Sequence, residues 1–388
     1  MKIKGLLQDI GGASRVTKAR LGAMRSASLV ADTFDPIGAV AEEWHPSVLR
    51  LVVTEIRSAG PTAKTVRLQK AGGGKLPPFY AGQFISLAFV LDGHVLCRPY
   101  SICSAPFEAR REPGYVEITV RRKADGLVSD YVNDRLQVGD RLQGSMGHGQ
   151  FFYEPLRDAK RIVGLAVGVG VTPFLSMAKE IRNGTLDADL TILYDASTED
   201  IIRKDELDAL ACGRVRVVYV RPEDRDADGR LSADCIRQFS EGDTSYFLCG
   251  PQETVQGLRE ELKACGVPAR RIRAEVTGQP TDIAQAAGYP AEQKNETYQL
   301  TVVRGVHRDV IPAKASESLV VACERAGILL LTDCRSGACG FCRTKVLQGK
   351  YYVCPENDGR RAADREFDYV HACATYPLSD MTIKIPIV

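Results

Sequence analysis

Short runs of alternating hydrophobic and polar residues begin at Leu49 and continue to about Pro155. They read L-R-L-V-V-T-E-I, T-V-R-L-Q, Q-F-I-S-L-A-F-V and Y-V-E-I-T-V-R-R, and Gly- and Pro-rich segments separate them. Alternation with a period of two is typical of strands that bury one face, and many short strands at this spacing indicate an antiparallel barrel. The pattern therefore predicts a β-barrel domain over residues 48–156.

A different pattern begins at Lys160, where continuous hydrophobic runs alternate with helical segments. The run R-I-V-G-L-A-V-G-V-G predicts a buried strand that enters a glycine turn, and T-P-F-L-S-M-A-K-E-I predicts the helix that follows. Further buried strands are predicted at D-L-T-I-L-Y-D, V-R-V-V-Y-V and S-Y-F-L-C-G. Fully hydrophobic strands between helices indicate a parallel sheet covered on both faces. We expect an α/β domain over residues 157–276.

The two ends of the chain differ from these blocks. A polar segment rich in Gly, Pro and Ala, residues 277–297, predicts a linker. Residues 298–388 follow it and have the size of a ferredoxin-like domain. Residues 1–47 are basic, interrupted by Gly and weakly amphipathic. They could bind a partner or touch a membrane surface peripherally, but we favour an ordered arm that packs on the body through Trp44.

Composition narrows the functional classes. The chain has 388 residues, of which 44% are hydrophobic and 26% charged, and these values are typical of a soluble protein of two to four domains. A formal net charge of +2 does not favour nucleic-acid binding. There is no uninterrupted run of eighteen apolar residues, so no transmembrane segment is expected. Most of the twelve cysteines stand singly in apolar contexts, and with no secretion signal in view they predict free thiols in a reducing cytoplasm.

Four cysteines form a separate pattern. The segment D-C-R-S-G-A-C-G-F-C-R-T-K contains Cys334, Cys339 and Cys342, and Cys373 follows about thirty residues later. This C-x4-C-x2-C…C spacing is that of plant-type 2Fe–2S clusters, whose iron prefers thiolate ligands. Gly337 and Gly340 lie where a loop must wrap tightly around a cluster. A zinc site is disfavoured because zinc knuckles usually offer two C-x2-C pairs, and this segment has one.

Two segments of the predicted barrel suit a flavin. Arg98-Pro99-Tyr100-Ser101 combines an aromatic face for the ring, a hydroxyl donor and a cation for phosphate. A second segment runs from Arg121 to Gly126-Leu127-Val128-Ser129 and leads into a helix, whose N-terminus can hold a pyrophosphate. That pyrophosphate favours FAD over FMN. The alternative for the second segment is an ordinary turn with a capping serine.

Two turns of the predicted α/β domain suit a dinucleotide. Gly168-Val169-Gly170-Val171-Thr172-Pro173 lies between a strand and a helix, where glycines let phosphates approach the backbone. It is not the G-x-G-x-x-G pattern of ordinary dehydrogenases. Cys249-Gly250-Pro251 ends a later strand, and its simpler interpretation is a buried cysteine before a turn.

The strand after the glycine turn bears on the choice of donor. It ends at Asp195, which can accept hydrogen bonds from a ribose 2′-hydroxyl and repel a 2′-phosphate, and Glu199 and Asp200 add negative charge. We therefore expect NADH over NADPH. Arg203 and Lys204 are the alternative, because they could reach back to a phosphate.

In this order, the motifs resemble the ferredoxin-NADP reductase superfamily, in the subgroup that carries a C-terminal plant-type ferredoxin domain. The resemblance covers about residues 48–388. It implies a flavin β-barrel, a nicotinamide-binding α/β domain and a β-grasp ferredoxin domain. It also implies that Arg98, Tyr100 and Ser101 bind the flavin, and that Gly126 to Ser129 hold its pyrophosphate.

The resemblance assigns the remaining motifs as well. Gly168 to Pro173 would bind the nicotinamide dinucleotide, and Cys249 to Pro251 would bring a thiol near the nicotinamide. Cys334 and Cys339 would bind one iron, and Cys342 and Cys373 the other. One departure is Glu275-Val276-Thr277, where relatives often have an aromatic residue in the third position that covers the flavin.

These motifs predict a reductase that passes electrons from NAD(P)H through FAD and a 2Fe–2S cluster to a separate acceptor metalloprotein such as an oxygenase. Ser101 and Cys249 are the expected catalytic residues. Two alternatives remain. One is a direct reductase of a small molecule or quinone, and the other is a non-catalytic electron-delivery subunit or redox sensor.

Overall fold

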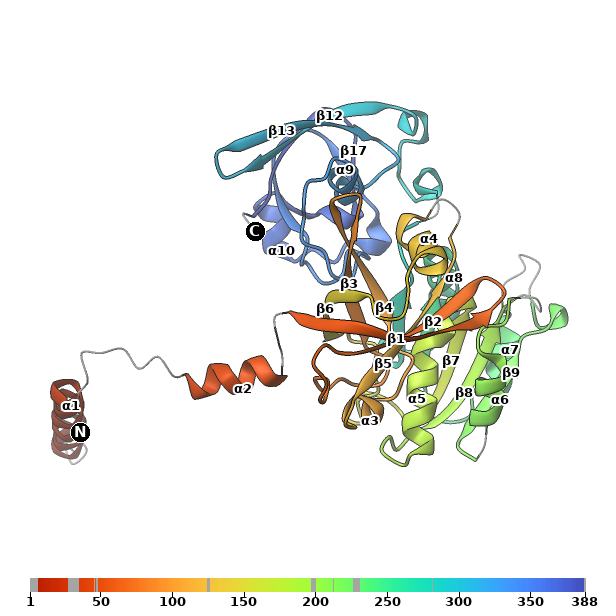
Figure 1. Ribbon diagram of the computed structural model, residues 1–388, viewed down its shortest axis with the longest axis horizontal. Helices are drawn as coiled ribbons and strands as arrows, with labels where there is room; N and C mark the ends of the chain where they lie inside the picture. The colour runs from red at the N-terminus through yellow and green to blue at the C-terminus, as the bar shows by residue number, and fades with distance from the viewer. Residues whose placement is uncertain are drawn as a thin grey trace. The chain divides into compact units, whose positions relative to one another are not determined.

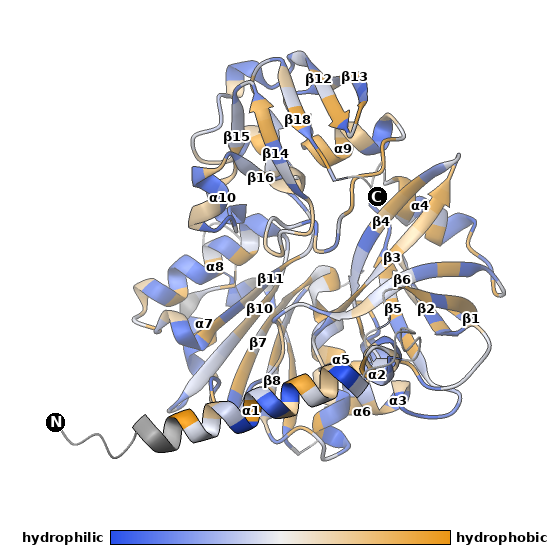
Figure 2. Cartoon of the chain, turned by 90° about the vertical axis from the view of Figure 1, so that its left-hand side faces the viewer, coloured by the Kyte–Doolittle hydropathy of each residue, from blue (hydrophilic) through white to orange (hydrophobic). Residues whose placement is uncertain are grey.

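A computed structural model of the chain describes residues 6–26, 35–44, 46, 48–123, 126–196, 200–211, 213–225, 231–280 and 282–386. Residues 1–46 and 47–388 form two separate units. The first unit contains α1 (Leu6–Ser26) and α2 (Pro36–Trp44), and hydrophobic and hydrophilic residues are interspersed along α1 (Figure 2). No residue of α2 is buried, and Trp44 is 55% exposed. The packing of this segment as an arm stays a prediction.

The second unit begins with a six-stranded antiparallel sheet (Figure 1). Its strands and short helices are β1 (Leu49–Gly60), β2 (Ala63–Lys70), β3 (Phe84–Leu91), β4 (His94–Ser101), α3 (Pro106–Ala109), β5 (Tyr115–Arg121), α4 (Leu127–Asp134) and β6 (Arg141–His148). The strand order is β4-β3-β6-β1-β2-β5, and a bridge between Ile102 and Ile118 joins the two edges. Alternate residues such as Leu49, Leu51 and Val53 are buried, as a period of two requires. The predicted barrel is confirmed.

A five-stranded parallel sheet follows, in the order β11-β10-β7-β8-β9. Its elements are β7 (Arg161–Val167), η1 (Gly168–Val171), α5 (Thr172–Arg182), β8 (Asp189–Asp195), α6 (Lys204–Leu210), β9 (Val215–Tyr219), η2 (Pro222–Asp224), α7 (Ala233–Gln238), β10 (Thr244–Gly250), α8 (Gln252–Ala264), η3 (Ala269–Arg271) and β11 (Ile272–Val276). Neighbouring residues of β7 lie in different cores, Ile162 in one and Val163 in the other. Both faces of this sheet are therefore covered, as its hydrophobic strands predict.

The C-terminal part is a mixed sheet in the order β13-β12-β18-β14-β16, in which β12 and β18 run parallel. Its elements are β12 (Thr297–Arg304), β13 (His307–Lys314), α9 (Leu319–Arg325), β14 (Arg343–Gln348), β15 (Tyr351–Val353), η6 (Pro355–Asn357), α10 (Ala362–Glu366), β16 (Tyr369–His371), η7 (Ala372–Ala374), β17 (Thr375–Pro377) and β18 (Met381–Lys384). One face of α9 is buried in the core of this sheet. The arrangement is the expected β-grasp.

The segment that joins the second and third domains is packed rather than free. It forms η4 (Ile283–Gln285) and η5 (Ala291–Gln293). Ile283 and Tyr289 are buried in a small core with Tyr352, Cys354 and Tyr376 of the C-terminal domain. The segment is polar overall, so its composition predicts a linker and gives no sign of the role of these two apolar residues. Their burial holds the segment against the C-terminal domain.

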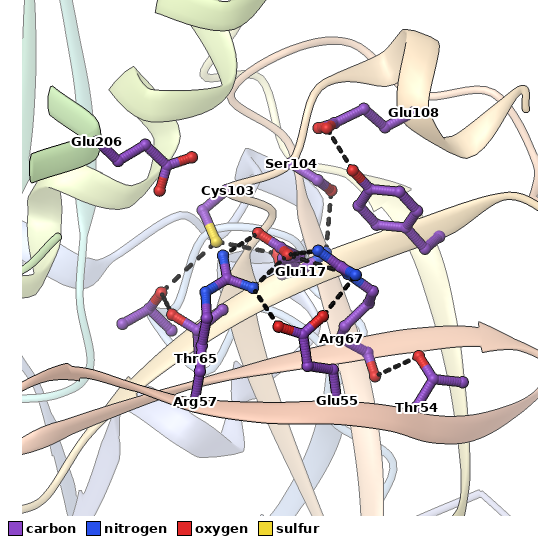
Figure 3. Close-up of polar contacts among 12 residues, drawn as sticks. Thr54, Glu55, Arg57, Thr65, Arg67, Cys103, Ser104, Glu108, Glu117 and Glu206 are labelled. Carbon is purple, nitrogen blue, oxygen red and sulfur yellow. Dashed lines mark hydrogen bonds and ion pairs between the residues drawn. The ribbon is translucent and has the colours of Figure 1, made fainter. Parts of the chain in front are cut away.

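A buried carboxylate connects the barrel to the α/β domain (Figure 3). Glu117 of β5 accepts hydrogen bonds from Arg57 at 2.7 Å, Arg67 at 2.9 Å and Arg203 at 3.0 Å. Arg203 belongs to the α/β domain, where it caps α6. Burial by itself raises the pKa of Glu117, but the bond with Arg57 and the charge of Arg203 outweigh it and hold the pKa well below its usual range. The carboxylate is therefore a charged crosslink between two domains.

We expect Glu117→Gln to destabilise the protein by about 3–5 kcal/mol at pH 7, because it removes the buried negative charge that the buried Arg203 shares with the partly exposed Arg57 and Arg67. The folded-state pKa is depressed, so this contribution is complete above the unfolded pKa and is lost as the pH falls below about 4. Calorimetric melting of both proteins between pH 7 and pH 3.5 checks this. Glu55→Gln is the matched control, because Glu55 bonds to Arg57 and Arg67 with a side chain that is 38% exposed. An equal loss of stability in the two variants would contradict the assignment.

Candidate functional site

The Arg98–Ser101 motif forms the end of β4, which is an edge strand of its sheet. An edge strand tolerates Pro99, which cannot donate a ladder hydrogen bond. The ring of Tyr100 packs edge-on against that of Phe89, with 6.4 Å between the ring centroids. Burial raises the pKa of Tyr100. The guanidinium of Arg98 donates to the carbonyl of Cys97 and to Glu324. The motif thus presents a fixed aromatic ring, a hydroxyl and a cation side by side on one strand.

The second barrel motif lies at the start of α4. Gly126 caps the helix, and the Ser129 hydroxyl donates to its carbonyl at 3.0 Å and accepts from the Lys123 amide at 3.1 Å. The hydroxyl therefore bonds to neighbouring backbone groups, but Ser129 is not the helix cap, because that position is held by Gly126, which makes no side-chain capping bond. Leu127 is exposed and Val128 is buried in the barrel core. Arg121, at the end of β5, pairs with Asp200 at 3.2 Å.

The strand order of the parallel sheet reverses between β7 and β10, and such switch points bind ligands at the carboxyl ends of the strands. Both predicted turns lie there. Gly168 and Gly170 follow β7, and Cys249-Gly250-Pro251 ends β10. A side chain at Gly170 would place its Cβ 2.1 Å from the Cys249 carbonyl oxygen, so the turns touch and only glycine fits. Thr172 and Pro173 then begin α5.

The barrel motif meets the switch point through a residue for which the sequence predicted no function. The Ser101 hydroxyl donates to Glu275 of β11 at 2.9 Å, and Glu275 pairs with Cys249 in the strand register. Burial raises the pKa of Glu275 to about 7 and raises the pKa of Cys249 further above its ordinary value. A Cβ on Gly149 would lie 3.6 Å from the Glu275 carboxylate, and the neighbouring His148 lies 3.7 Å from the carboxylate of Asp333, so the cysteine loop that starts at Cys334 is close by. A hydroxyl, a thiol and a carboxyl group thus gather where two domains meet.

The end of β8 carries an ion pair. Asp195 is 7% exposed and accepts two hydrogen bonds from Arg225, the shorter at 2.5 Å. Arg203 is not available for a phosphate, contrary to the alternative drawn from the sequence, because its side chain is 3% exposed and bonded to Glu117 and Glu206. Lys204 pairs with Asp208 at 2.5 Å. Glu199 lies outside the described residues.

Backbone amides surround the cysteine loop. Cys334 Sγ accepts from the amides of Ser336 at 3.5 Å and Cys339 at 3.3 Å, and Cys339 Sγ accepts from Phe341 at 3.4 Å. Cys373 Sγ accepts from the amide of Gly337 at 3.2 Å, which joins the distant fourth cysteine to the loop. Amide donors to sulfur stabilise thiolates and tune clusters.

Two features of the loop fit its role as a cluster cradle. Gly337 and Gly340 have φ values of +79° and +76°, and a Cβ on Gly337 would lie 2.0 Å from the Asn357 carbonyl oxygen. The side chains also lie in pairs, because Cys339 interacts with Cys334 and lowers its pKa, and Cys373 interacts with Cys342 and lowers its pKa. The assignment of one such pair to each iron, which the family resemblance implies, stays a prediction.

Comparison with known proteins accounts for all three parts of the second unit. The family model described as "Oxidoreductase FAD-binding domain" matches residues 51–153, and "Oxidoreductase NAD-binding domain" matches residues 165–260. The model described as "2Fe-2S iron-sulfur cluster binding domain" matches residues 305–378. The chain belongs to the ferredoxin-NADP reductase superfamily, among members with a C-terminal 2Fe–2S domain. It is an oxidoreductase with FAD, NAD and 2Fe–2S domains, as predicted.

Individual relatives align with most of the chain. The chain is 28% identical to the NADH oxidoreductase HCR of Escherichia coli, over 79% of this chain and 89% of that protein. It is 28% identical to the glycine betaine monooxygenase reductase subunit of Chromohalobacter salexigens, over 79% of this chain and 87% of that protein. The solved structure of phthalate dioxygenase reductase shares the fold, with a TM-score of 0.63 at 23% identity over 88% of this chain and 98% of that one.

Among the helices of the described ranges, none is both long enough and apolar enough to cross a bilayer.

We expect Cys342→Ser to abolish the visible absorption and electron paramagnetic resonance of the cluster while FAD remains bound, because the two sites lie in separate domains. Cys354→Ser is the matched control. It removes another buried thiol of the same domain, one that bonds to Glu356 and Gln252 and not to the cysteine loop. Cluster loss from the control, or its retention in Cys342→Ser, would contradict the ligand set.

Proposed function

We propose that this protein is the reductase component of an electron-transfer system. A nicotinamide dinucleotide gives a hydride to FAD, and electrons continue through the 2Fe–2S cluster to a separate metalloprotein such as an oxygenase. The flavin, when bound, converts a two-electron donor into single electrons. The observation that carries the proposal is the Ser101–Glu275 bond of 2.9 Å, which joins the flavin strand to the nucleotide switch point beside the cysteine loop.

Each site in this proposal has its own residues. The flavin contacts comprise Arg98, Pro99, Tyr100, Ser101, Arg121, Gly126, Leu127, Val128 and Ser129. The dinucleotide contacts comprise Gly168, Gly170, Thr172, Pro173, Asp195, Cys249, Gly250 and Pro251. The iron ligands comprise Cys334, Cys339, Cys342 and Cys373. Ser101 and Cys249 are the residues proposed to contact the reacting rings, and Glu275 orients the Ser101 hydroxyl.

A protein acceptor is favoured over a small molecule. Cys339 is exposed, and the neighbouring Phe341 is 59% exposed, so electrons have an outlet at the protein surface beside an apolar contact. The reductase subunit of glycine betaine monooxygenase is named for such a partnership. Buried thiols outside the cluster loop, such as Cys103, Cys235 and Cys323, are not paired in disulfides, which supports a reducing cytoplasmic location. Peripheral membrane contact by residues 1–46 is a separate proposal, supported only by the exposed apolar residues of α1 and α2.

Reduction of cytochrome c by NADH tests the reductase function. We expect steady turnover by the wild-type protein and loss of that turnover in Cys342→Ser, whereas ferricyanide, which can take electrons from the flavin directly, stays reducible. Cytochrome c turnover that survives loss of the cluster would favour a direct reductase. Absence of any NADH oxidation would favour a non-catalytic subunit or sensor.

We further propose a preference for NADH, supported by Asp195 at the end of β8 and by the engagement of Arg203 with Glu117. Asp195→Ala should lower the ratio of kcat/KM for NADH to that for NADPH by about tenfold or more, since a hydrogen bond to a charged group contributes about 1.5–3 kcal/mol. Arg225→Gln should raise the ratio, because it frees the carboxylate and removes the nearby cation. A wild-type ratio that favours NADPH would contradict the proposal.

A further inference from the structure

A bidentate carboxylate lies between two arginines at the junction of the barrel and the ferredoxin domain. Glu324 of α9 accepts from Arg98 at 2.9 and 3.3 Å and from Arg335 at 2.6 and 3.2 Å. The side chain of Glu324 is 10% exposed and that of Arg335 9%. Paired, bidentate contacts with little exposure define geometry more strictly than surface ion pairs do.

The two arginines come from the two redox motifs of the chain. Arg98 opens the flavin motif on β4, and Arg335 lies between the first two cysteines of the cluster loop. Arg335 adopts the left-handed conformation, with φ +53°, which a residue with a side chain rarely adopts. Glu324 itself belongs to neither motif. It therefore links the two cofactor sites without being part of either.

The backbone at the end of α9 contacts the same hairpin. His94, at the tip of the β3–β4 hairpin, bonds to the Glu324 carbonyl at 3.1 Å. A Cβ on Gly327 would come within 3.0 Å of the His94 ring, so the helix end and the hairpin tip are in close contact (Figure 1). The carboxylate bridge is thus the centre of a specific docking contact between the domains.

The charges of the bridge are unbalanced. One carboxylate faces two guanidinium groups, which leaves an excess positive charge beside the cysteine loop. A 2Fe–2S cluster with four thiolates is a dianion when oxidised and gains another negative charge on reduction. The local field therefore favours the reduced cluster, and removal of the Glu324 charge would increase that effect.

We propose that Glu324 is a positioning residue that holds the ferredoxin domain on the flavin barrel by bridging Arg98 and Arg335. The inference rests on the proposed function, since it assumes electron flow from FAD to the cluster. Glu324 acts on the step between the two cofactors and leaves hydride transfer from the nicotinamide unchanged.

Anaerobic stopped-flow mixing of the holoprotein with NADH separates the two steps. In Glu324→Gln we expect flavin bleaching within twofold of the wild-type rate and cluster reduction slower by about tenfold or more, as for loss of one partner of a buried pair. Glu317→Gln is the matched control, because Glu317 bonds to Arg325 and Lys314 inside the ferredoxin domain. Both phases of the control should stay within twofold of wild type.

Two readouts do not depend on turnover. The midpoint potential of the cluster should become more positive in Glu324→Gln, because a negative charge near it has been removed. Limited proteolysis within residues 277–297 should become faster, because the domain is held less firmly. Glu324→Asp keeps the charge on a shorter side chain, and it should retain the wild-type potential with an intermediate rate of cluster reduction.

The outcomes separate the two proposals. Cluster reduction at the wild-type rate in Glu324→Gln overturns the positioning role, as does a slow phase with unchanged potential and proteolysis. If Glu324→Gln fails to retain its cluster, Glu324→Asp decides the matter, and a wild-type rate there overturns the role. If the wild-type cluster is not reduced by NADH at all, the proposed function has failed instead.

Discussion

The close approach of two turns determines where this protein can act. The turn after β7 and the turn after β10 meet at the reversal of the strand order, with space for a hydrogen but not for a methyl group at Gly170. Because these turns touch, the carboxyl ends of β7 and β10 form one continuous surface. The pairing of Cys249 with Glu275 extends this surface to β11, and the Ser101 hydroxyl contacts Glu275 from the barrel. The arrangement of Ser101, Cys249 and Glu275 depends on this contact.

Polar bonds join the three domains at the contacts that matter for function, and the barrel and the α/β domain also share an apolar core that includes Ala59 and Phe174. Glu117 accepts a hydrogen bond from Arg203, Glu275 accepts one from Ser101, and Glu324 accepts one from Arg98. Directional bonds of this kind allow little sliding, in contrast to hydrophobic contacts of similar area. They therefore define a relative orientation of the domains, and cofactors bound in separate domains need such an orientation.

The parts of this structure that could be predicted from sequence are those whose signals are local. Strand periodicity predicted the barrel and the α/β domain, the size of the last block and its cysteines predicted the third domain, and the spacing of glycines and cysteines predicted the turns and the cluster loop. The missed contacts join residues far apart in the chain. Glu275 is 174 positions from Ser101, and Glu324 is 226 positions from Arg98. Arg225 reached Asp195 from a later loop, and Arg203 pointed into the barrel instead of toward a nucleotide, because a buried carboxylate there attracts it more strongly. Partners that lie so far apart in the chain leave no local pattern in a single sequence, so sequence reasoning cannot identify them.

The burial of Ile283 and Tyr289 affects how far the ferredoxin domain can move during electron transfer. A ferredoxin domain on a free tether would alternate between the flavin and its acceptor, and each turnover would wait for a diffusive search. Here Ile283 and Tyr289 pack against the ferredoxin domain itself, so little of the connecting segment is free to let that domain move. Asp333, next to Cys334, lies 3.7 Å from His148 of the barrel, while Cys339 is exposed, so one side of the loop faces the barrel and the other faces solvent. A cluster bound in this loop could then receive electrons on its inner side and pass them on from its outer side without movement of the domain. An acceptor protein could therefore bind before the flavin is reduced.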